Sequence, residues 1–203
     1  MMPSFSLPTR WPLICGLIIA LMLIAATPGA GVIRSAAAQT QAVSLPRLIE
    51  GRAIDVADGD TFILLDDLGK RWRVRLGGID APESTQPWAD RSRQHLSDWL
   101  RDTRVHLVPI KTDPFGRLVA RTLIPAPEPG TARAGERIDV GLLLVEAGLA
   151  WHFKRYKSDQ TPAEFAAFAQ AEIRARQAQR GLWAEPDPEP PWAYRERLRA
   201  ERR

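Results

Sequence analysis

The sequence VADGDTF at residues 56–62 is followed by VRLGGIDAPE at residues 74–83. In the first stretch, Asp58-Gly59 is a dipeptide that typically forms the tight turn of a β-hairpin. The apolar residues on both sides of this turn predict strands over residues 48–57 and 60–65. These stretches therefore mark the beginning of a β-rich fold.

A third strand is predicted over residues 71–76, after a hairpin loop at residues 66–70. Apolar and cationic residues alternate along it: Trp72, Val74 and Leu76 against Arg71, Arg73 and Arg75. A period of two is typical of a strand with one buried face. The pattern predicts a half-buried strand that carries three arginines on its open face.

The rest of the domain mixes strands and helices. Apolar runs predict strands over residues 105–110 and 118–124, joined by a turn at residues 111–117. Helical spacing of apolar residues predicts helices over residues 88–101, 139–148 and 161–181, with Phe165, Phe168, Ala169 and Ile173 buried on the last of these. That helix begins with a capping box, Thr161-Pro162-Ala163-Glu164, and Asp139 is the expected cap of the helix before it. The predicted fold is α+β and mainly β: a small five-stranded barrel with about three packed helices.

Composition narrows the functional classes. The 203 residues are 45% hydrophobic and 26% charged, which excludes a wholly disordered chain. The single cysteine excludes an intramolecular disulfide framework and a zinc cluster built on cysteines. The formal charge of +4 is compatible with a polyanionic partner but does not require one.

The N-terminal region is typical of a secretory signal. Arg10 precedes an uncharged apolar run at residues 13–26, and Pro28 and the small residues 36–38 follow it. We expect residues 1–38 to be a signal peptide and residues 39–47 a linker, so that the protein is secreted or periplasmic. The alternative is an uncleaved anchor with the protein facing outside the cytoplasm, because a run extended to Ile33 reaches about 20 residues.

Residues 185–203 form an extension of biased amino-acid composition, which follows a predicted domain at residues 48–184. Residues 185–191, EPDPEPP, are acidic and proline-rich and are expected to be extended. The basic stretch at residues 192–203 is interpreted as a solvated extension, with a role in gripping nucleic acid as the alternative.

Polar residues of the predicted barrel suggest a chemistry when they are taken together. Asp60 and Asp80 supply hard oxygen ligands, which suit calcium or magnesium better than zinc. Arg75 and Arg117 can clamp a phosphate and stabilise its developing charge. Glu83 can orient or deprotonate an attacking water. Each residue alone is ordinary, but the set predicts a metal-dependent phosphodiesterase.

The two opening stretches resemble the thermonuclease, or staphylococcal-nuclease-like, family. Three later stretches agree in order and spacing: residues 113–117 (DPFGR), 144–151 (LVEAGLAW) and 180–183 (RGLW). The resemblance covers roughly residues 48–183. It implies an OB-fold barrel with helices and calcium-dependent hydrolysis of DNA and RNA that leaves 3′-phosphates.

The resemblance also assigns roles by position. It implies that one Ca²⁺ is held by Asp60, Asp80 and the backbone carbonyl of Ala81, and that a carboxylate at Asp58 holds a metal-bound water. It places the catalytic side chains at Arg75, Glu83 and Arg117. Ala81 stands where some members have threonine, and Phe115 stands where many have tyrosine.

Substrate-binding candidates are aromatic. Phe115 can stack or pack but cannot donate a hydrogen bond to phosphate. Trp151, Phe153 and Tyr156 are interleaved with cationic residues, which suits single-stranded nucleic acid, and Tyr156 is the member of this group that we assign to the site. The expected partner is DNA, RNA or both, no stable protein partner is implied, and a membrane is involved only if the N-terminal segment stays uncleaved.

Two other classes of function stay open. The basic residues of the predicted barrel also suit a groove of a non-catalytic OB-fold module that binds nucleic acid. The proline-rich tail suits an interaction protein of the cell envelope. The complete set of Arg75, Glu83 and Arg117 favours the enzyme.

Overall fold

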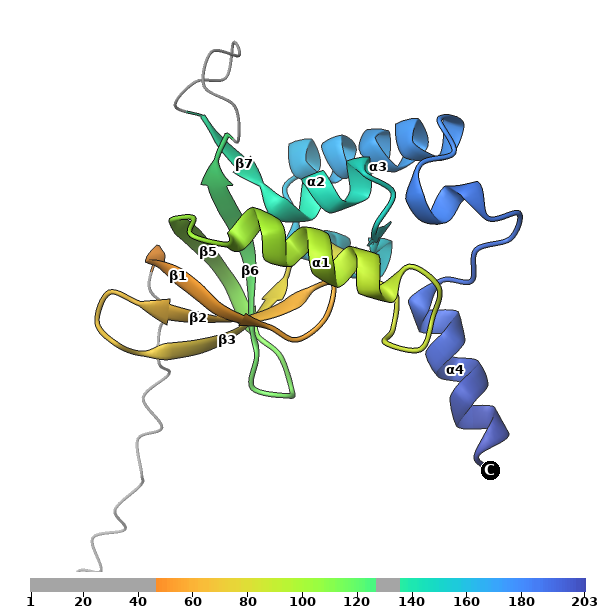
Figure 1. Ribbon diagram of the computed structural model, residues 1–203, viewed down its shortest axis with the longest axis horizontal. Helices are drawn as coiled ribbons and strands as arrows, with labels where there is room; N and C mark the ends of the chain where they lie inside the picture. Colours follow the sequence, from red (N-terminus) through yellow and green to blue (C-terminus); the bar gives the residue numbers. More distant parts are fainter. Residues whose placement is uncertain (1–46, 127–135) are drawn as a thin grey trace, which may run out of the picture. The chain divides into compact units, whose positions relative to one another are not determined.

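The computed structural model describes residues 47–126 and 136–203 (Figure 1). The predicted signal peptide at residues 1–38 and residues 39–46 of the predicted linker lie outside these ranges. Within them, no helix is both long enough and apolar enough to cross a membrane.

Five strands close into a mixed barrel. The strands are β1 (Ile49–Val56), β2 (Thr61–Asp66), β3 (Arg71–Leu76), β5 (Val105–Thr112) and β6 (Leu118–Pro125). Neighbours in the order β3-β2-β1-β5-β6 pair antiparallel, and a parallel pairing of β3 with β6 closes the ring. A sixth strand, β7 (Arg137–Asp139), adds to the free part of β6. This closed barrel with its helices confirms the predicted OB-fold, α+β architecture.

The barrel core follows the alternation of the strands. Phe62 and Leu64 of β2 lie opposite Val74 and Trp72 of β3, and Phe62, Leu64 and Val74 are fully buried. Burying an apolar side chain of this size stabilises the fold by about 1.5–3 kcal/mol. The inward set therefore fixes the register of β2 and β3, because a slip of one residue would turn it toward solvent.

Three helices cover the barrel as predicted. They are α1 (Ala89–Leu100), α2 (Val140–Glu146) and α3 (Pro162–Gln177). Asp139 caps α2, since its carboxylate accepts the N–H of Gly141 at 2.9 Å. The capping box that begins α3 is also present.

The predicted buried face and end of α3 are partly wrong. Ile173 is 43% exposed, whereas Phe168, Ala171 and Ala175 are buried. The helix ends at Gln177 rather than at Gly181. Gly181 is required for a different reason: a Cβ on it would lie 2.1 Å from the carbonyl oxygen of Gly148, so the two loops approach closely only because of it.

Several short elements and one further helix lie outside the predicted set. A two-stranded sheet joins β4 (Ile79–Asp80) to β8 (Trp151–His152). The turns η1 (Lys154–Asp159) and η2 (Gly181–Ala184) flank α3, and α4 (Pro191–Glu201) ends the chain. The small sheet matters most, because β4 carries an acidic residue of the predicted site.

His152 of β8 is a buried histidine. Its ring packs against Phe165 and Phe168, with centroids 4.7 and 5.7 Å away, and its Nε2 lies 3.0 Å from Oε1 of Gln160. Burial lowers the pKa of His152 below its usual value of 6.5. The folded protein therefore favours the neutral ring, and this contribution to stability is lost as the pH falls below 6.5.

We expect the melting temperature of the wild type to fall more steeply than that of His152→Gln between about pH 7.5 and about pH 5.5. Glutamine can still hydrogen-bond to Gln160 but cannot take up a proton. The substitution also changes packing, so thermal unfolding across the pH range is compared as slopes rather than absolute values. Parallel slopes would show that another group dominates the acid response.

Candidate active site

A tight turn and the small sheet bring the two acidic stretches together. A Cβ on Gly59 would lie 2.2 Å from Oγ of Ser92 and 2.8 Å from Cβ of Ala81. Glycine therefore lets the β1–β2 turn pack directly on α1 and on the segment after β4. As a result the N–H of Ala81 donates to Oδ2 of Asp60 at 3.1 Å, and the N–H of Asp60 donates to Oδ1 of Asp58 at 2.9 Å.

Arg75 bridges two buried carboxylates. Its Nη1 donates to Oδ1 of Asp60 at 2.6 Å, and its Nη2 donates to Oδ1 of Asp80 at 2.8 Å. Asp60 and Asp80 are only 4% and 1% exposed. The structure thus places three of the predicted site residues in one ion-paired cluster.

The expectation that Arg75 lies on an open strand face is wrong in its detail. Its side chain is 18% exposed, whereas Arg71 and Arg73 of the same strand are exposed. The reason is that the end of β3 lies beside the β1–β2 turn, where the N–H of Leu76 donates to the carbonyl of Asp60 at 2.9 Å. The third arginine of the alternation therefore faces carboxylates rather than water.

The cluster is rich in negative charge. Burial, and after it the neighbouring charge of Asp60, raise the pKa of Asp58 to about 6. Burial also raises the pKa of Asp80, although its arginine partners act in the opposite direction. Burial opposes the charge of Arg75, but Asp60 and Asp80 outweigh it and hold the pKa of Arg75 above its usual range. A further positive charge at this place would be stabilised.

Arg117 is fixed by the turn that precedes β6. Oδ1 of Asp113 accepts the N–H groups of Phe115 and Arg117, both at 2.9 Å, and its Oδ2 accepts Nε of Arg117 at 2.7 Å. Nη1 of Arg117 lies 3.4 Å from the hydroxyl of Thr61, which donates to Asp60 at 2.9 Å. Asp113 was predicted only as part of a turn, but it is the residue that orients Arg117.

The two aromatic candidates lie in different surroundings. Phe115 is 77% exposed, and its ring centroid is 5.6 Å from the guanidinium carbon of Arg117. Tyr156 of η1 packs against Phe153 at 5.4 Å and lies under Nζ of Lys111 at 4.4 Å. Phe115 therefore stands beside a member of the cluster, whereas these contacts of Tyr156 are made with residues outside it.

Glu83 lies on the loop between β4 and α1. Its N–H donates to Oε1 of Gln86 at 2.9 Å, which holds the loop, while its own side chain is 38% exposed. Oε1 of Glu83 accepts Nη1 of Arg195 at 2.6 Å. Arg195 belongs to α4, so the interpretation of the C-terminal stretch as a solvated extension is wrong.

Sequence reasoning missed Arg195 completely. It lies 112 residues after Glu83, and nothing in the spacing of the basic tail distinguishes it from the other arginines there. The proline-rich run before it gave the only signal, since PPW at residues 190–192 places proline at the first helical position. That signal predicts a helix but not its contact.

Comparisons with known proteins identify the family. A family model described as staphylococcal nuclease homologue matches residues 73–185, more than half of the chain. An "Uncharacterized endonuclease" of Escherichia coli is 32% identical over 149 residues, which are 73% of this chain and 86% of that protein. A "Micrococcal nuclease" of Shigella flexneri is 33% identical over 162 residues, 79% of this chain and 89% of that protein. The chain belongs to the staphylococcal nuclease family.

A plant relative matches this chain over a smaller part of its own length. A "Staphylococcal-like nuclease CAN1" of Arabidopsis thaliana is 31% identical over 132 residues, which are 65% of this chain and 36% of that protein. The family match includes Arg75, Asp80, Glu83 and Arg117 but ends before α4. Membership of the staphylococcal nuclease family supports endonuclease activity, that is, hydrolysis of nucleic acid.

The donor chemistry of this family member fits a hard cation. Asp60 and Asp80 offer carboxylate oxygens within a cluster whose charge favours a cation, and Ala81 adds a main-chain carbonyl to the same segment. Within the described residues, no three acidic, histidine or cysteine side chains surround a common point. A bound cation would therefore take its further oxygen donors from the main chain, water or substrate.

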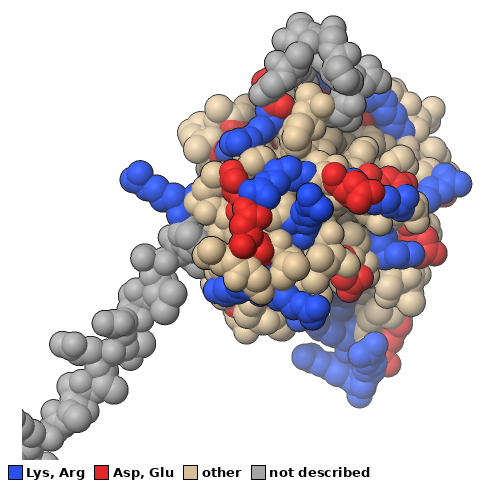
Figure 2. Space-filling view, turned by 60° about the vertical axis from the view of Figure 1, so that its left-hand side comes forward, with Lys and Arg blue, Asp and Glu red and all other residues tan. Residues whose placement is uncertain are grey.

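The surface around this nuclease domain carries both signs of charge. On the face shown in Figure 2, acidic and basic side chains are interspersed rather than gathered into one basic band.

Proposed function

We propose that this protein is a calcium-dependent endonuclease that hydrolyses phosphodiester bonds of DNA, RNA or both and leaves 3′-phosphates. The observation that carries the proposal is the bridge made by Arg75 between the buried Asp60 and Asp80, with Glu83 at its edge. This arrangement supplies cation ligands, a phosphate clamp and a base within one cluster.

The cation would be held by Asp60, Asp80 and the carbonyl of Ala81. When bound, it would neutralise charge on the phosphate and act as a Lewis acid. Asp58 is a positioning residue, because its carboxylate accepts the N–H of Asp60 and so orients the turn that carries this ligand.

The two arginines retain donors for the phosphate. Each guanidinium has five N–H groups. Arg75 directs Nη1 and Nη2 to its carboxylate partners, and Arg117 directs Nε to Asp113. The remaining N–H groups can stabilise the negative charge that grows on the phosphoryl oxygens.

Glu83 is the proposed base. A water attacks the phosphorus in line with the 5′-oxygen, its proton passes to the Glu83 carboxylate, and the bond between phosphorus and the 5′-oxygen breaks. The phosphate thus stays on the 3′-oxygen, and the 5′-oxygen leaves as a hydroxyl after it takes up a proton.

Digestion of DNA and RNA in Ca²⁺ or in chelator tests the proposal. We expect cleavage in Ca²⁺, no cleavage in chelator, and 3′-phosphates at the ends of the products. Binding without cleavage in Ca²⁺ would instead identify an OB-fold binding module.

We also propose that the protein is exported. The support is the signal-like pattern of residues 1–38. N-terminal sequencing of protein from the culture medium or the periplasm tests it, with Gln39 expected as the first residue. Recovery of full-length chains in the membrane fraction alone would identify an anchor instead.

A further inference from the structure

The C-terminal helix α4 places the guanidinium group of Arg195 on Asp80, which is an expected metal ligand. Arg195 donates through Nη2 to Oδ2 of Asp80 at 2.7 Å and through Nη1 to Oδ1 of the same residue at 3.3 Å. Its Nη1 also pairs with Glu83 at 2.6 Å. One residue from outside the matched family region therefore contacts both a proposed cation ligand and the proposed base.

Both oxygens of Asp80 are occupied by guanidinium groups. Oδ1 accepts Nη2 of Arg75 at 2.8 Å, and Oδ2 accepts Nη2 of Arg195. The side chain of Asp80 is 1% exposed, so no second approach from solvent is open. A calcium ion binds a carboxylate oxygen at about 2.3–2.6 Å. Such an ion on Oδ2 would need the space and the lone pairs that Arg195 uses.

We propose that Arg195 and the catalytic cation compete for Asp80, and that α4 is a C-terminal cap which must release Asp80 before the cation binds. This inference rests on the proposed function. The Arg195 guanidinium and a metal cation that share the carboxylate of Asp80 would repel each other. Occupation of Asp80 by one of them therefore excludes the other. Linkage then requires that whatever holds α4 in place weakens cation binding, and that the cation loosens α4 to the same degree.

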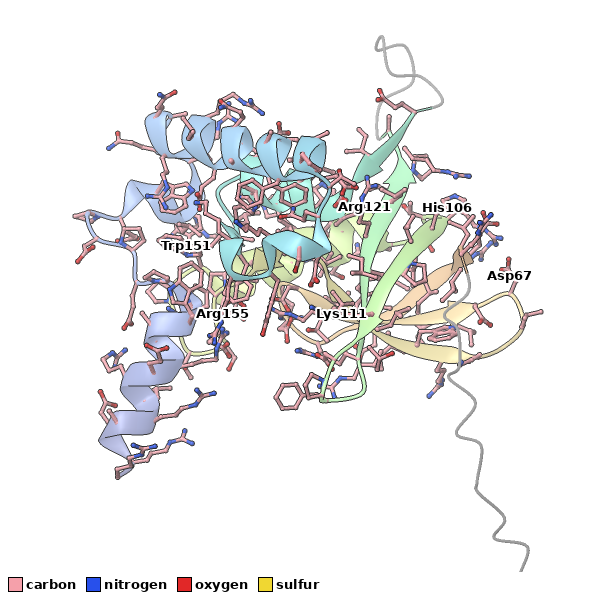
Figure 3. All side chains as sticks on the ribbon, turned by 180° about the vertical axis from the view of Figure 1, so that it is seen from behind. Asp67, His106, Lys111, Arg121, Trp151 and Arg155 are labelled. Atoms are coloured by element: carbon pink, nitrogen blue, oxygen red, sulfur yellow. The ribbon has the colours of Figure 1, made fainter. Side chains whose placement is uncertain are left out.

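The cap is held by an aromatic anchor and by two hydrogen bonds. Trp192 packs against Trp151 and Phe153, with centroids 5.6 and 5.5 Å away, and Figure 3 shows Trp151 on the side of the domain that faces α4. The hydroxyls of Tyr194 and Thr85 lie 2.5 Å apart. Nε2 of Gln86 donates to the carbonyl of Glu189 at 3.0 Å, just before the helix.

These anchors join the cap to the site itself. Thr85 and Gln86 lie on the loop that carries Glu83, and Trp151 is the strand partner of Asp80. Trp192 and Arg195 are three residues apart, so they lie on the same face of α4. Movement of the helix would therefore move the aromatic anchor and the guanidinium together.

Calorimetric titration with Ca²⁺ tests the competition without an activity readout. We expect Arg195→Gln to bind Ca²⁺ about 10-fold more tightly than the full-length wild type, because the competing cation is gone. The matched control is Arg199→Gln, which removes the same charge from an exposed position one turn further along α4. It should stay within about 2-fold of the wild type, since a distant surface charge contributes little.

A second variant loosens the helix without altering the ligands. Trp192→Ala keeps Arg195 but removes the anchor, so it should also tighten Ca²⁺ binding, by a smaller factor. Unchanged or weaker Ca²⁺ binding in both folded variants would overturn the inference. Digestion by the wild type in Ca²⁺ and in chelator, run in parallel, reports on the proposed function separately. Calcium-stimulated digestion together with unchanged Ca²⁺ affinity in the variants would overturn the role of α4 alone.

Discussion

Glu83→Gln is expected to lower the rate of nucleic acid hydrolysis by at least about 100-fold while the protein stays folded. Glutamine has nearly the same shape as glutamate but cannot accept the proton of the attacking water. The side chain is 38% exposed, so loss of its pair with Arg195 should cost less than about 1 kcal/mol of stability.

Initial rates of digestion in saturating Ca²⁺, with melting temperatures recorded alongside, measure this effect. Glu201→Gln makes the same chemical change at an exposed position near the end of α4 and should keep wild-type activity. Activity of Glu83→Gln equal to that control would remove Glu83 from the mechanism. A large loss of melting temperature would mean that its role is structural.

Arg75→Ala is expected to lose both activity and stability. The alanine variant leaves Asp60 without its charged partner in a buried position, and breaking a buried ion pair in this way costs about 3–5 kcal/mol. The lower end, about 3 kcal/mol, is expected here because Arg195 still pairs with Asp80. Activity should fall by about 100-fold or more, since a phosphate clamp is also removed.

Denaturant unfolding in chelator measures the stability of this variant. Arg73→Ala, two residues away on the exposed face of β3, is the matched control and should change the free energy of unfolding by about 0.5 kcal/mol or less. Addition of Ca²⁺ should stabilise Arg75→Ala, because a bound cation replaces the missing charge. Equal stability of the Arg75 and Arg73 variants would show that the bridge has no structural role.

Local patterns predicted the barrel and most of its helices well. The Asp58-Gly59 turn, the alternation of residues 71–76 and the capping box at Thr161 each depend on neighbours along the chain. Interactions of this kind are set by backbone geometry over a few residues, so they are visible in the sequence. The grouping of Asp60, Arg75 and Asp80 was suggested by the combined chemistry of these side chains and by the family resemblance rather than by any local pattern.

The remaining features depend on contacts between distant parts of the chain. Alternation placed Arg75 on an open face, but closure of the barrel brings it against Asp60 and Asp80. Ile173 was assigned to the core because it is apolar, yet the packed face of α3 is lined by Phe168 and small alanines instead. Arg195 reaches Asp80 across 115 residues, and no periodicity encodes such a contact.

Calcium-dependent endonuclease activity is tested by digestion of a circular DNA and of an RNA with the wild type, with Ca²⁺ present, chelated and then restored. We predict internal cleavage in Ca²⁺, loss of cleavage in chelator, recovery when Ca²⁺ is returned, and no comparable cleavage by Glu83→Gln. Binding of either nucleic acid without cleavage in Ca²⁺, or cleavage that is indifferent to chelator, would contradict it.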